Sequence, residues 1–343
     1  MVKMNFYKNP KKDFIQCLAC YNFCLIKNQE RGLCGVRKNS NGKLKLLVKN
    51  KPIAINIDPI EKKPLFHFLP GEKAFSLGTL GCNFSCQFCQ NWDISQLPKN
   101  QTEKNIYWGD NWSPSKIINY CLKNNLRIIA YTYNEPTIWV EYALEIMKQA
   151  KKKGIKNIWV SNGFMSEYTL KAVAPYLDAI NIDLKSFSED FYQNICQGKL
   201  LPVKENIKKV FQLGIWEEIT TLIIPNLNDT EEELEAIANF LKDISPDIVW
   251  HISAFYPAYQ MFDKKPTSLE NLLKAYNIGK KVGLRYVYTG NILNLETEST
   301  FCPKCGNLVI QRLGIQLIEN KLIKNKCPHC GYQIPGIFDL SLK

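Results

Sequence analysis

Seven apolar, β-branched runs separated by helical patterns constrain the fold of this chain more than any other feature. The runs lie at residues 74–80, 127–133, 157–161, 179–185, 218–225, 249–255 and 285–289. Helical patterns lie between most of them, and in the pattern at 229–244 either Asp229 or Thr230 can cap the first turn. Repeated strand–helix units predict an α/β protein with a parallel sheet, right-handed crossovers and an open or partial barrel. Functional side chains of such folds lie just after the strands, at their carboxyl ends.

Three regions divide the 343 residues: an N-terminal segment at 1–70 with four cysteines and extended strands, the strand–helix region at 71–297 and a C-terminal segment at 298–343. Of the 13 cysteines, only Cys121 and Cys196 lie outside three clusters, and both are expected to be small buried hydrophobes. Neither a signal peptide nor a transmembrane segment is apparent, so a cytoplasmic location without membrane contact is expected. In that setting clustered cysteines indicate metal ligands rather than disulfides.

The cysteine triplet Cys82, Cys86 and Cys89 follows the first strand with the spacing C-x3-C-x2-C. A loop of this length lets three thiolates converge on one face of a [4Fe–4S] cluster. Such clusters normally take four cysteines, so three leave one iron open for chemistry. The alternatives are a zinc site that lacks one ligand and a cluster whose fourth cysteine comes from elsewhere in the chain.

The segment CNFSCQFC at 82–89 resembles the CxxxCxxC signature of the radical S-adenosylmethionine (SAM) superfamily. The resemblance covers roughly residues 71–290 and implies a partial (β/α)6 barrel. It also implies that the open iron chelates the amino and carboxylate groups of SAM. An electron from the cluster then yields methionine and a 5′-deoxyadenosyl radical, which abstracts hydrogen from a C–H bond. Phe88 is expected against the adenine by this resemblance, with ordinary core packing as the alternative.

Polar residues follow three later strands and are candidates for SAM binding. The family often carries Gly-Gly-Glu after the second strand, whereas this chain has Asn134 and Glu135, a form similar to the glycyl-radical-activase branch. Glu135 can pair with an ammonium group, or it can simply cap a helix. After the next two strands the candidates are Ser161, Asn162, Asp183 and Lys185.

Ser161 and Asn162 suit the ribose or the methionine carboxylate, Asp183 can accept hydrogen bonds, and Lys185 can neutralise a carboxylate. His251 lies within the sixth strand, and a role in SAM binding is weighed evenly against a structural one. Residues 288–291 are expected to close the barrel end and to shape the substrate pocket.

Two further cysteine quartets flank the barrel. The C-terminal quartet forms two CxxCG knuckles, which predict a zinc ribbon with a rubredoxin-like iron site as the alternative, and consists of Cys302, Cys305, Cys327 and Cys330. His329 lies inside the second knuckle and is not needed as a ligand. The N-terminal quartet has the spacing C-x2-C-x3-C-x9-C, suits either zinc or a second iron–sulfur cluster, and consists of Cys17, Cys20, Cys24 and Cys34.

The whole layout resembles the radical SAM proteins of the AmmeMemoRadiSam system. The resemblance rests on CLACYNFCLIKNQERGLCGVR, DPIEKKPLFHFLPG, the triplet, and a CPxCG ribbon that ends in GYQIPGIF. It implies kinship with pyruvate formate-lyase activating enzymes and association with AMMECR1-like and Memo-like partners. His67 lies in the second of these segments, and either reaches the cluster face or packs in a loop.

The sequence therefore predicts a radical SAM enzyme, an activating-enzyme-like oxidoreductase that takes electrons from a donor such as flavodoxin or ferredoxin. Its substrate is unknown and is a small molecule, a protein or a nucleic acid. One alternative is a glycyl-radical enzyme activase. An alternative of another class is a zinc-dependent module that binds nucleic acid or protein through a degenerate barrel. The net charge of +12 fits acidic partners, but lysines spread along the whole chain favour a merely solvated surface.

Overall fold

A computed structural model describes residues 5–103 and 106–339 and contains an eight-stranded central sheet. Its strand order is β13-β12-β11-β10-β9-β8-β7-β6. The strands are β6 (Ala54–Pro59), β7 (Lys73–Gly78), β8 (Ile128–Tyr131), β9 (Lys156–Ser161), β10 (Ala179–Asp183), β11 (Trp216–Ile223), β12 (Val249–Ala254) and β13 (Val287–Gly290). The seven strands from β7 to β13 run parallel, which confirms the α/β class and the seven predicted strands. β6 pairs antiparallel with β7, so the central sheet extends into the N-terminal segment.

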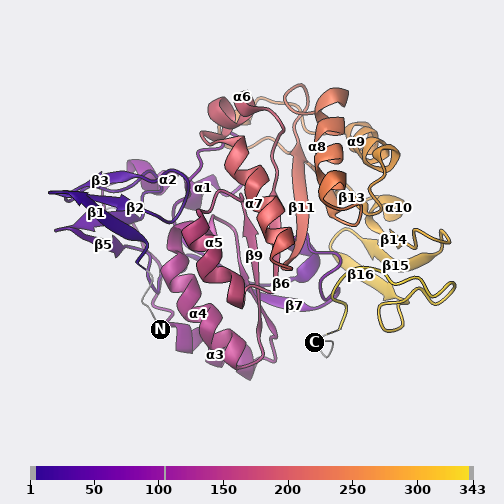
Figure 1. Cartoon of the computed structure of the whole chain (residues 1–343), viewed down its shortest axis with the longest axis horizontal. Coiled ribbons are helices and arrows are strands. Elements are labelled where there is room, and N and C mark those ends of the chain that lie inside the picture. Colours follow the sequence, from indigo (N-terminus) through magenta and orange to yellow (C-terminus); the bar gives the residue numbers. More distant parts are fainter. Residues whose placement is uncertain (1–4, 104–105, 340–343) are drawn as a thin grey trace.

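Helices connect successive parallel strands, and Figure 1 shows α4, α5, α7 and α8 along one face of the sheet. The cap of α8 is Thr230, whose side chain accepts a hydrogen bond from the backbone of Glu233. The α-helices are α1 (Trp92–Ser95), α2 (Leu97–Asn100), α3 (Pro114–Lys123), α4 (Val140–Lys152), α5 (Glu167–Val173), α6 (Glu189–Phe191), α7 (Leu200–Gln212), α8 (Glu231–Ile244), α9 (Leu269–Val282) and α10 (Leu295–Glu298). The 3-10 helices are η1 (Ile60–Lys62), η3 (Pro136–Trp139), η4 (Ala174–Tyr176) and η6 (Tyr259–Met261), and η5 (Tyr192–Cys196) is a π-helix.

An N-terminal lobe and a C-terminal module lie on opposite sides of the central α/β region, at the left and right of Figure 1. The lobe contains a three-stranded sheet and a hairpin: β1 (Tyr7–Lys11), β2 (Phe14–Cys17), β3 (Leu25–Lys27), β4 (Arg37–Ser40) and β5 (Lys43–Leu46). The module contains β14 (Thr300–Phe301), β15 (Leu308–Leu313) and β16 (Gln316–Asn320).

Buried polar groups attach both parts to the central α/β region. The Arg37 guanidinium of the lobe binds Glu141 of α4 at 2.8 and 2.5 Å. The Arg312 guanidinium of the module donates to the carbonyl of Phe66 at 2.6 Å. Since both arginines are buried, they fix the orientation of each part by charge-assisted hydrogen bonds.

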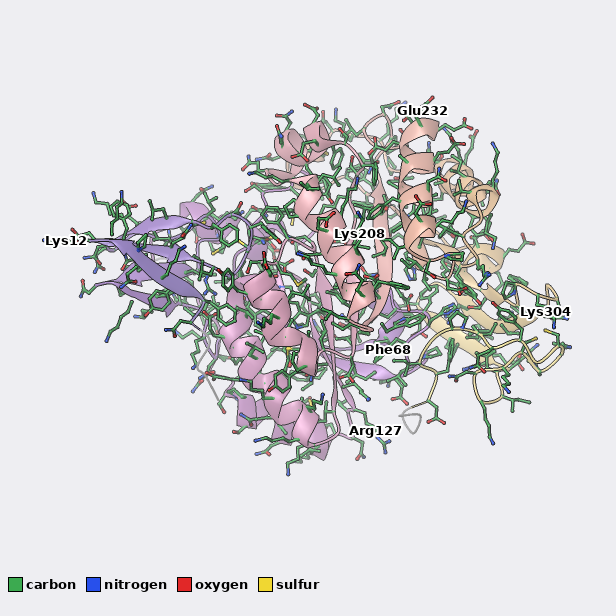
Figure 2. All side chains as sticks on the ribbon, in the orientation of Figure 1. Lys12, Phe68, Arg127, Lys208, Glu232 and Lys304 are labelled. Atoms are coloured by element: carbon green, nitrogen blue, oxygen red, sulfur yellow. The ribbon has the colours of Figure 1, made fainter. Side chains whose placement is uncertain are left out.

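The charge of the chain is spread over the molecule. Figure 2 shows the basic side chains Lys12, Lys208 and Lys304 at well-separated places on its outside. Within the described residues, none of the helices is both long and apolar enough to cross a membrane.

Candidate active site

A cavity of about 530 Å³ lies at the carboxyl ends of the parallel strands. Every SAM candidate named from the sequence lines it except His251, together with all three triplet cysteines: Cys82, Cys86, Cys89, Phe88, Asn134, Glu135, Ser161, Asn162, Asp183 and Lys185. The parallel register brings residues from separate strand ends to this one edge of the sheet, as expected for such folds.

The triplet loop presents three thiols to this cavity in a setting that also contains cations. Burial raises the pKa of Cys82 and of Cys89, and a hydrogen bond with the Cys196 thiol, together with burial, raises the pKa of Cys86. The ammonium groups of Lys99 and Lys185 oppose this effect electrostatically. Protonated thiols are poor ligands, so a bound metal has to displace their protons. The nearby cations suit the negative charge that metal-bound thiolates carry.

Asn134 fastens the end of β8 to the start of the triplet loop. Its Oδ1 accepts hydrogen bonds from the Thr79 backbone at 3.1 Å and from the Trp139 indole at 3.3 Å. Its Nδ2 donates to the carbonyl of Gly81 at 2.9 Å, immediately before Cys82. The amide is therefore occupied by the protein and positions the cysteine loop.

The Glu135 carboxylate is similarly occupied, by donors at the ends of β8 and β9. It accepts from the backbone amides of Thr137 at 3.0 Å and Asn162 at 2.8 Å, and from the hydroxyls of Thr137 and Ser161 at 2.5 and 2.9 Å. Burial raises the pKa of Glu135, although these donors favour its ionised form. Four donors use most of the capacity of a carboxylate, so Glu135 orders the two strand ends.

Asp183 and Lys185 form an ion pair at the end of β10. The Lys185 ammonium lies 2.9 Å from Asp183 Oδ2 and 5.7 Å from the centre of the Phe88 ring. Burial alone would lower the pKa of Lys185, but its attraction to Asp183 and to Cys86 raises it overall. The Asp183 side chain is 34% exposed, which leaves it accessible to a ligand in the cavity.

His251 lies apart from the cavity. Its Nε2 lies 2.7 Å from Oε2 of buried Glu218, whose two oxygens also accept from the backbone amides of Phe66 and His67. His67 is fully buried between the Pro335 carbonyl, at 2.8 Å from Nδ1, and the Tyr288 hydroxyl, at 2.7 Å from Nε2. The packed-loop alternative therefore describes His67.

Several residues around the cavity carried no signal in the sequence. The Lys99 ammonium donates to the Phe84 carbonyl at 2.6 Å and to the Ser85 hydroxyl at 2.9 Å, within the triplet loop. Lys63 also lines the cavity and binds Asp58 at 2.6 Å; although burial opposes ionisation, this bond holds the pKa of Asp58 well below its usual range. The buried Thr220 hydroxyl lines the cavity without a hydrogen-bond partner among the described residues.

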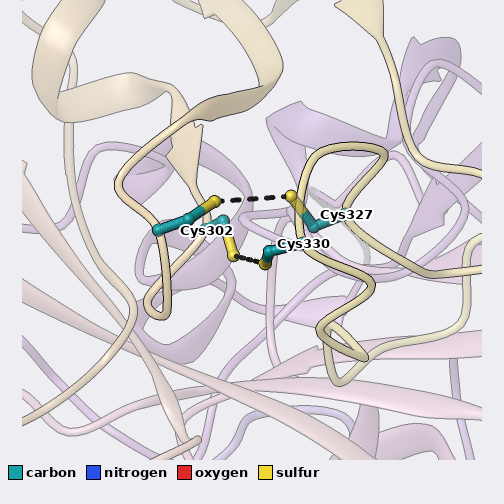
Figure 3. Close-up of side chains that lie close together, drawn as sticks. Cys302, Cys327 and Cys330 are labelled. Atoms are coloured by element: carbon teal, nitrogen blue, oxygen red, sulfur yellow. Dashed lines mark hydrogen bonds between the residues drawn. The ribbon is translucent and has the colours of Figure 1, made fainter.

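The C-terminal cysteine quartet has the spacing of a single-metal site. Figure 3 shows the two knuckles with their sulfur atoms facing each other. Cys302 and Cys330 sulfurs lie 3.5 Å apart, and those of Cys305 and Cys327 lie 3.7 Å apart. Tetrahedral Zn–S bonds of about 2.3 Å place sulfurs about 3.8 Å apart, so this quartet fits a metal ion. Neither the sulfurs of the N-terminal quartet nor those of the triplet all lie within 4.8 Å of one another, and the N-terminal cysteines line a small separate cavity.

Comparison with known proteins agrees with this geometry. Residues 77–241 match a family model described as the radical SAM superfamily. An uncharacterized protein of Methanocaldococcus jannaschii is 39% identical over 332 residues, which span 96% of this chain and 97% of the relative. The pyruvate formate-lyase-activating enzyme of Clostridium pasteurianum is 21% identical over 170 residues, 48% of this chain and 67% of that enzyme.

A solved structure shares the fold at low identity. A radical SAM methyltransferase from Sphaerobacter thermophilus superimposes with a TM-score of 0.51 at 13% identity, over 66% of this chain and 68% of that chain. The mostly parallel sheet, the family match and the activating-enzyme relatives together establish that this chain belongs to the radical SAM superfamily, as an enzyme related to glycyl-radical enzyme activating enzymes.

Proposed function

We propose that Cys82, Cys86 and Cys89 hold a [4Fe–4S] cluster and that SAM binds beside it in the cavity. When bound, the cluster supplies the electron that cleaves SAM and so produces the 5′-deoxyadenosyl radical that abstracts hydrogen from a substrate. The observation that carries this proposal is the convergence of three thiols, a carboxylate and an ammonium on one cavity at the carboxyl ends of the strands.

The residues around the cavity divide into those free to bind SAM and those that position them. Lys185 suits the methionine carboxylate and Asp183 suits a hydroxyl or ammonium group, since both line the cavity beside the triplet. Phe88 also lines the cavity, where its ring can pack against the adenine. Asn134 and Glu135 act through the loops that they hold, because their own hydrogen-bonding groups are already used by the protein.

Anaerobic reconstitution followed by iron and sulfide analysis tests the proposal. We expect wild-type protein with reductant and SAM to yield 5′-deoxyadenosine, and Cys86→Ala to lose both this product and the cluster of the triplet. Cys121→Ala is the matched control, since Cys121 is also buried but lines neither the cavity of the triplet nor that of the N-terminal quartet. A Cys86→Ala variant that still forms 5′-deoxyadenosine would contradict the proposal.

Two kinds of enzyme, which differ in the class of their substrate, are candidates for this function. A glycyl-radical enzyme activase is favoured by the relative that activates pyruvate formate-lyase. A modifying enzyme acting on a small molecule or nucleic acid is the second candidate. To distinguish the two candidates, the enzyme is incubated with separate fractions of a deuterated cell extract, and deuterium is then measured in 5′-deoxyadenosine. The fraction that donates deuterium contains the substrate and shows whether it is a protein, a small molecule or a nucleic acid.

The flanking parts suggest further roles within this function. We propose zinc in the C-terminal quartet, because its sulfur distances match a tetrahedral ion. The division at 1–70, 71–297 and 298–343 follows the three cysteine clusters. A cytoplasmic reductant such as flavodoxin or ferredoxin suits the chemistry, and copurification with AMMECR1-like and Memo-like proteins tests the partners that the overall layout suggests.

A further inference from the structure

We propose that the floor of the cavity binds an anionic group of the substrate, a carboxylate or a phosphate, through the ammonium of Lys63 and the hydroxyl of Thr220. The proposal rests on the function proposed above and names the class of its substrate, a small acid. Lys63 follows η1 and Thr220 lies within β11, so the two residues come from distant parts of the sequence. Both line the cavity that the triplet cysteines also line.

The floor is formed by the chain segment that follows η1. Pro64 lines the cavity, and its carbonyl accepts a hydrogen bond from Asn181 Nδ2 at 2.8 Å. Asn181 lies two residues before Asp183 on β10, so both side chains are on the same face of the sheet, with Asn181 nearer the amino end. Two backbone amides of the same segment bind Glu218, which lies two residues before Thr220 on β11. The segment therefore closes the cavity on the side away from the carboxyl ends of the strands.

The Lys63 ammonium shares its counter-ion with a second lysine. It lies 2.6 Å from Oδ2 of Asp58, and the Lys62 ammonium lies 3.0 Å from Oδ1 of the same carboxylate. The Tyr133 hydroxyl also donates to Asp58 Oδ2. Both lysines and Tyr133 line the cavity. One carboxylate therefore serves two ammonium groups, which leaves an excess positive charge beside the cavity.

Burial makes this excess charge unfavourable at Lys63. The side chain of Lys63 is 2% exposed, whereas that of Lys62 is 49% exposed and is therefore stabilised by water. Burial lowers the pKa of Lys63, although its bond to Asp58 opposes this effect. Buried charges in proteins are stable when they are paired, so an anion that enters the cavity gains a partner that the protein alone does not fully supply.

Tyr133 holds the ion pair at the wall of the cavity. Its backbone has a φ of 69°, a left-handed conformation that aromatic residues rarely adopt. The residue lies so close to Gly78 that a Cβ there would be 3.0 Å from the Cβ of Tyr133. The Lys63 ammonium lies 4.7 Å from the centre of the Tyr133 ring. Strained backbone of this kind is found at ligand sites, where the surrounding structure maintains it. Here it keeps the Tyr133 hydroxyl on Asp58 and the ring beside Lys63.

The Thr220 hydroxyl offers a second polar contact for the anion. Thr220 is 7% exposed, and its Oγ1 has no hydrogen-bond partner among the residues that the structure describes. A buried polar group left in this way indicates a ligand that the cavity is built to hold. Thr220 pairs in register with Asp183 of β10, which forms the ion pair with Lys185. The anionic group is thereby placed next to the proposed SAM contacts, as hydrogen abstraction requires.

A carboxylate or a phosphate fits these two donors. An ammonium and a hydroxyl both donate hydrogen bonds, and an anionic oxygen accepts from both more strongly than a neutral one does. The glycine of a glycyl-radical enzyme carries no negative charge in its backbone and leaves Lys63 as it stands. The floor of the cavity therefore favours the second kind of enzyme, one that modifies a small acid.

Anion binding to the full-length reconstituted protein tests this subsite. SAM is added without reductant, so that it occupies its own site and is not cleaved. Radiolabelled inorganic phosphate and radiolabelled acetate are then measured separately by equilibrium dialysis, and the anion that binds more tightly identifies the source of the charge. Lys63→Met should raise its dissociation constant by about tenfold, as expected when one charge-assisted hydrogen bond is lost. If neither anion binds to wild type, or if Lys63→Met binds as tightly, the proposal is overturned.

Lys62→Met is the matched control. It removes the same charge from the same carboxylate, but from a half-exposed side chain, so the dissociation constant should change less than in Lys63→Met. Equal effects of the two substitutions would show that only the total charge around Asp58 matters and would overturn the subsite. Because Lys63→Met also removes a partner of Asp58, Thr220→Val supplies a variant without a change of charge. It should weaken binding of the same anion, and unchanged binding would overturn the role of Thr220.

Transfer of deuterium tests the substrate class separately from the proposed function. The small molecules of a deuterated cell extract are divided by anion exchange into retained and unretained fractions, and its proteins and nucleic acids are assayed alongside. We expect the retained fraction to place deuterium in 5′-deoxyadenosine, and the labelled share to fall by about tenfold in Lys63→Met. Label from another fraction, or an equal share in the variant, would overturn this proposal and uphold the function. Wild-type protein that makes no 5′-deoxyadenosine would refute the function and this proposal with it.

Discussion

Replacing Glu135 by glutamine tests whether this residue serves the protein scaffold or binds SAM directly. The carboxylate accepts hydrogen bonds from two backbone amides and two hydroxyls at the ends of β8 and β9. Glutamine keeps one acceptor oxygen and places an NH2 group where Oε2 now accepts from the Asn162 amide at 2.8 Å. That amide would then face another donor.

The expected loss in free energy of unfolding follows from the hydrogen bonds that the substitution removes. A hydrogen bond to a charged group contributes about 1.5–3 kcal/mol, and a buried donor without a partner costs about 1–3 kcal/mol. Burial disfavours the charged form of Glu135 and raises its pKa. Because glutamine carries no charge, the substitution also removes this unfavourable burial of charge, which offsets part of the loss in stability. We therefore expect Glu135→Gln to lower the free energy of unfolding by about 2 kcal/mol.

Urea unfolding and SAM titration on reconstituted protein, with Asp183→Asn as the matched control, measure the two roles separately. Asp183 is partly exposed and accepts from Lys185 within the same cavity. Asp183→Asn should weaken SAM binding with little change in unfolding, whereas Glu135→Gln should change both. A Glu135→Gln variant that unfolds like wild type but loses SAM binding would show that the carboxylate serves the ligand and would refute the reasoning.

Three further predictions concern the surroundings of the site. Burial lowers the pKa of His67 to about 4, so the contribution of its neutral form to stability is complete above pH 6.5 and is lost as the pH falls towards 4, by at most about 3 kcal/mol. In His67→Gln, the free energy of unfolding measured in urea should therefore depend less on pH between 4 and 6.5 than in wild type. The same pH dependence in both proteins would contradict this. Cys327→Ser should remove zinc from the purified protein and expose residues 298–343 to proteolysis, and retained zinc would contradict the C-terminal site. Gly198→Ala would place a Cβ 2.3 Å from the ring of Phe84, which lies in the triplet loop, and should lower the iron content of the protein. Gly290→Ala is the control, because the nearest atom to its Cβ would lie 3.7 Å away, and its iron content should be unchanged. Equal iron content in both variants would show that the triplet loop adapts.

The fold was predictable because buried parallel strands leave continuous apolar runs in the sequence. All seven such runs correspond to parallel strands of the central sheet. β6 escaped prediction as part of this sheet because its pattern is mixed: Asp58 is buried while Ile57 is 45% exposed. An antiparallel edge strand with one solvated face gives no continuous apolar run.

The site was predictable as a set of strand ends, but the partners of each side chain were not. Lys99 reaches the triplet loop from the short helix α2, and its LPKN segment resembles any surface turn. Cys196 lies beside Cys86 although the sequence gives it no neighbouring ligand. Such contacts depend on how loops after different strands pack together, which local periodicity does not encode.

Asn134 and Glu135, which the sequence suggested as SAM-binding residues, therefore serve the protein scaffold. Asn134 and Glu135 stand where the superfamily often has Gly-Gly-Glu, and both are held by the protein: Asn134 by the triplet loop, Glu135 by the end of β9. A two-glycine turn leaves backbone groups free, whereas two side chains that cross-link neighbouring strand ends make the edge rigid before a ligand arrives. Polar groups in the cavity that can still receive a ligand include the partly exposed Asp183 carboxylate and the unsatisfied Thr220 hydroxyl. Thr220→Val removes that hydroxyl at nearly constant shape, so a loss of SAM or substrate affinity without a loss of stability would show that the cavity recognises its ligand from β11 as well as from β10.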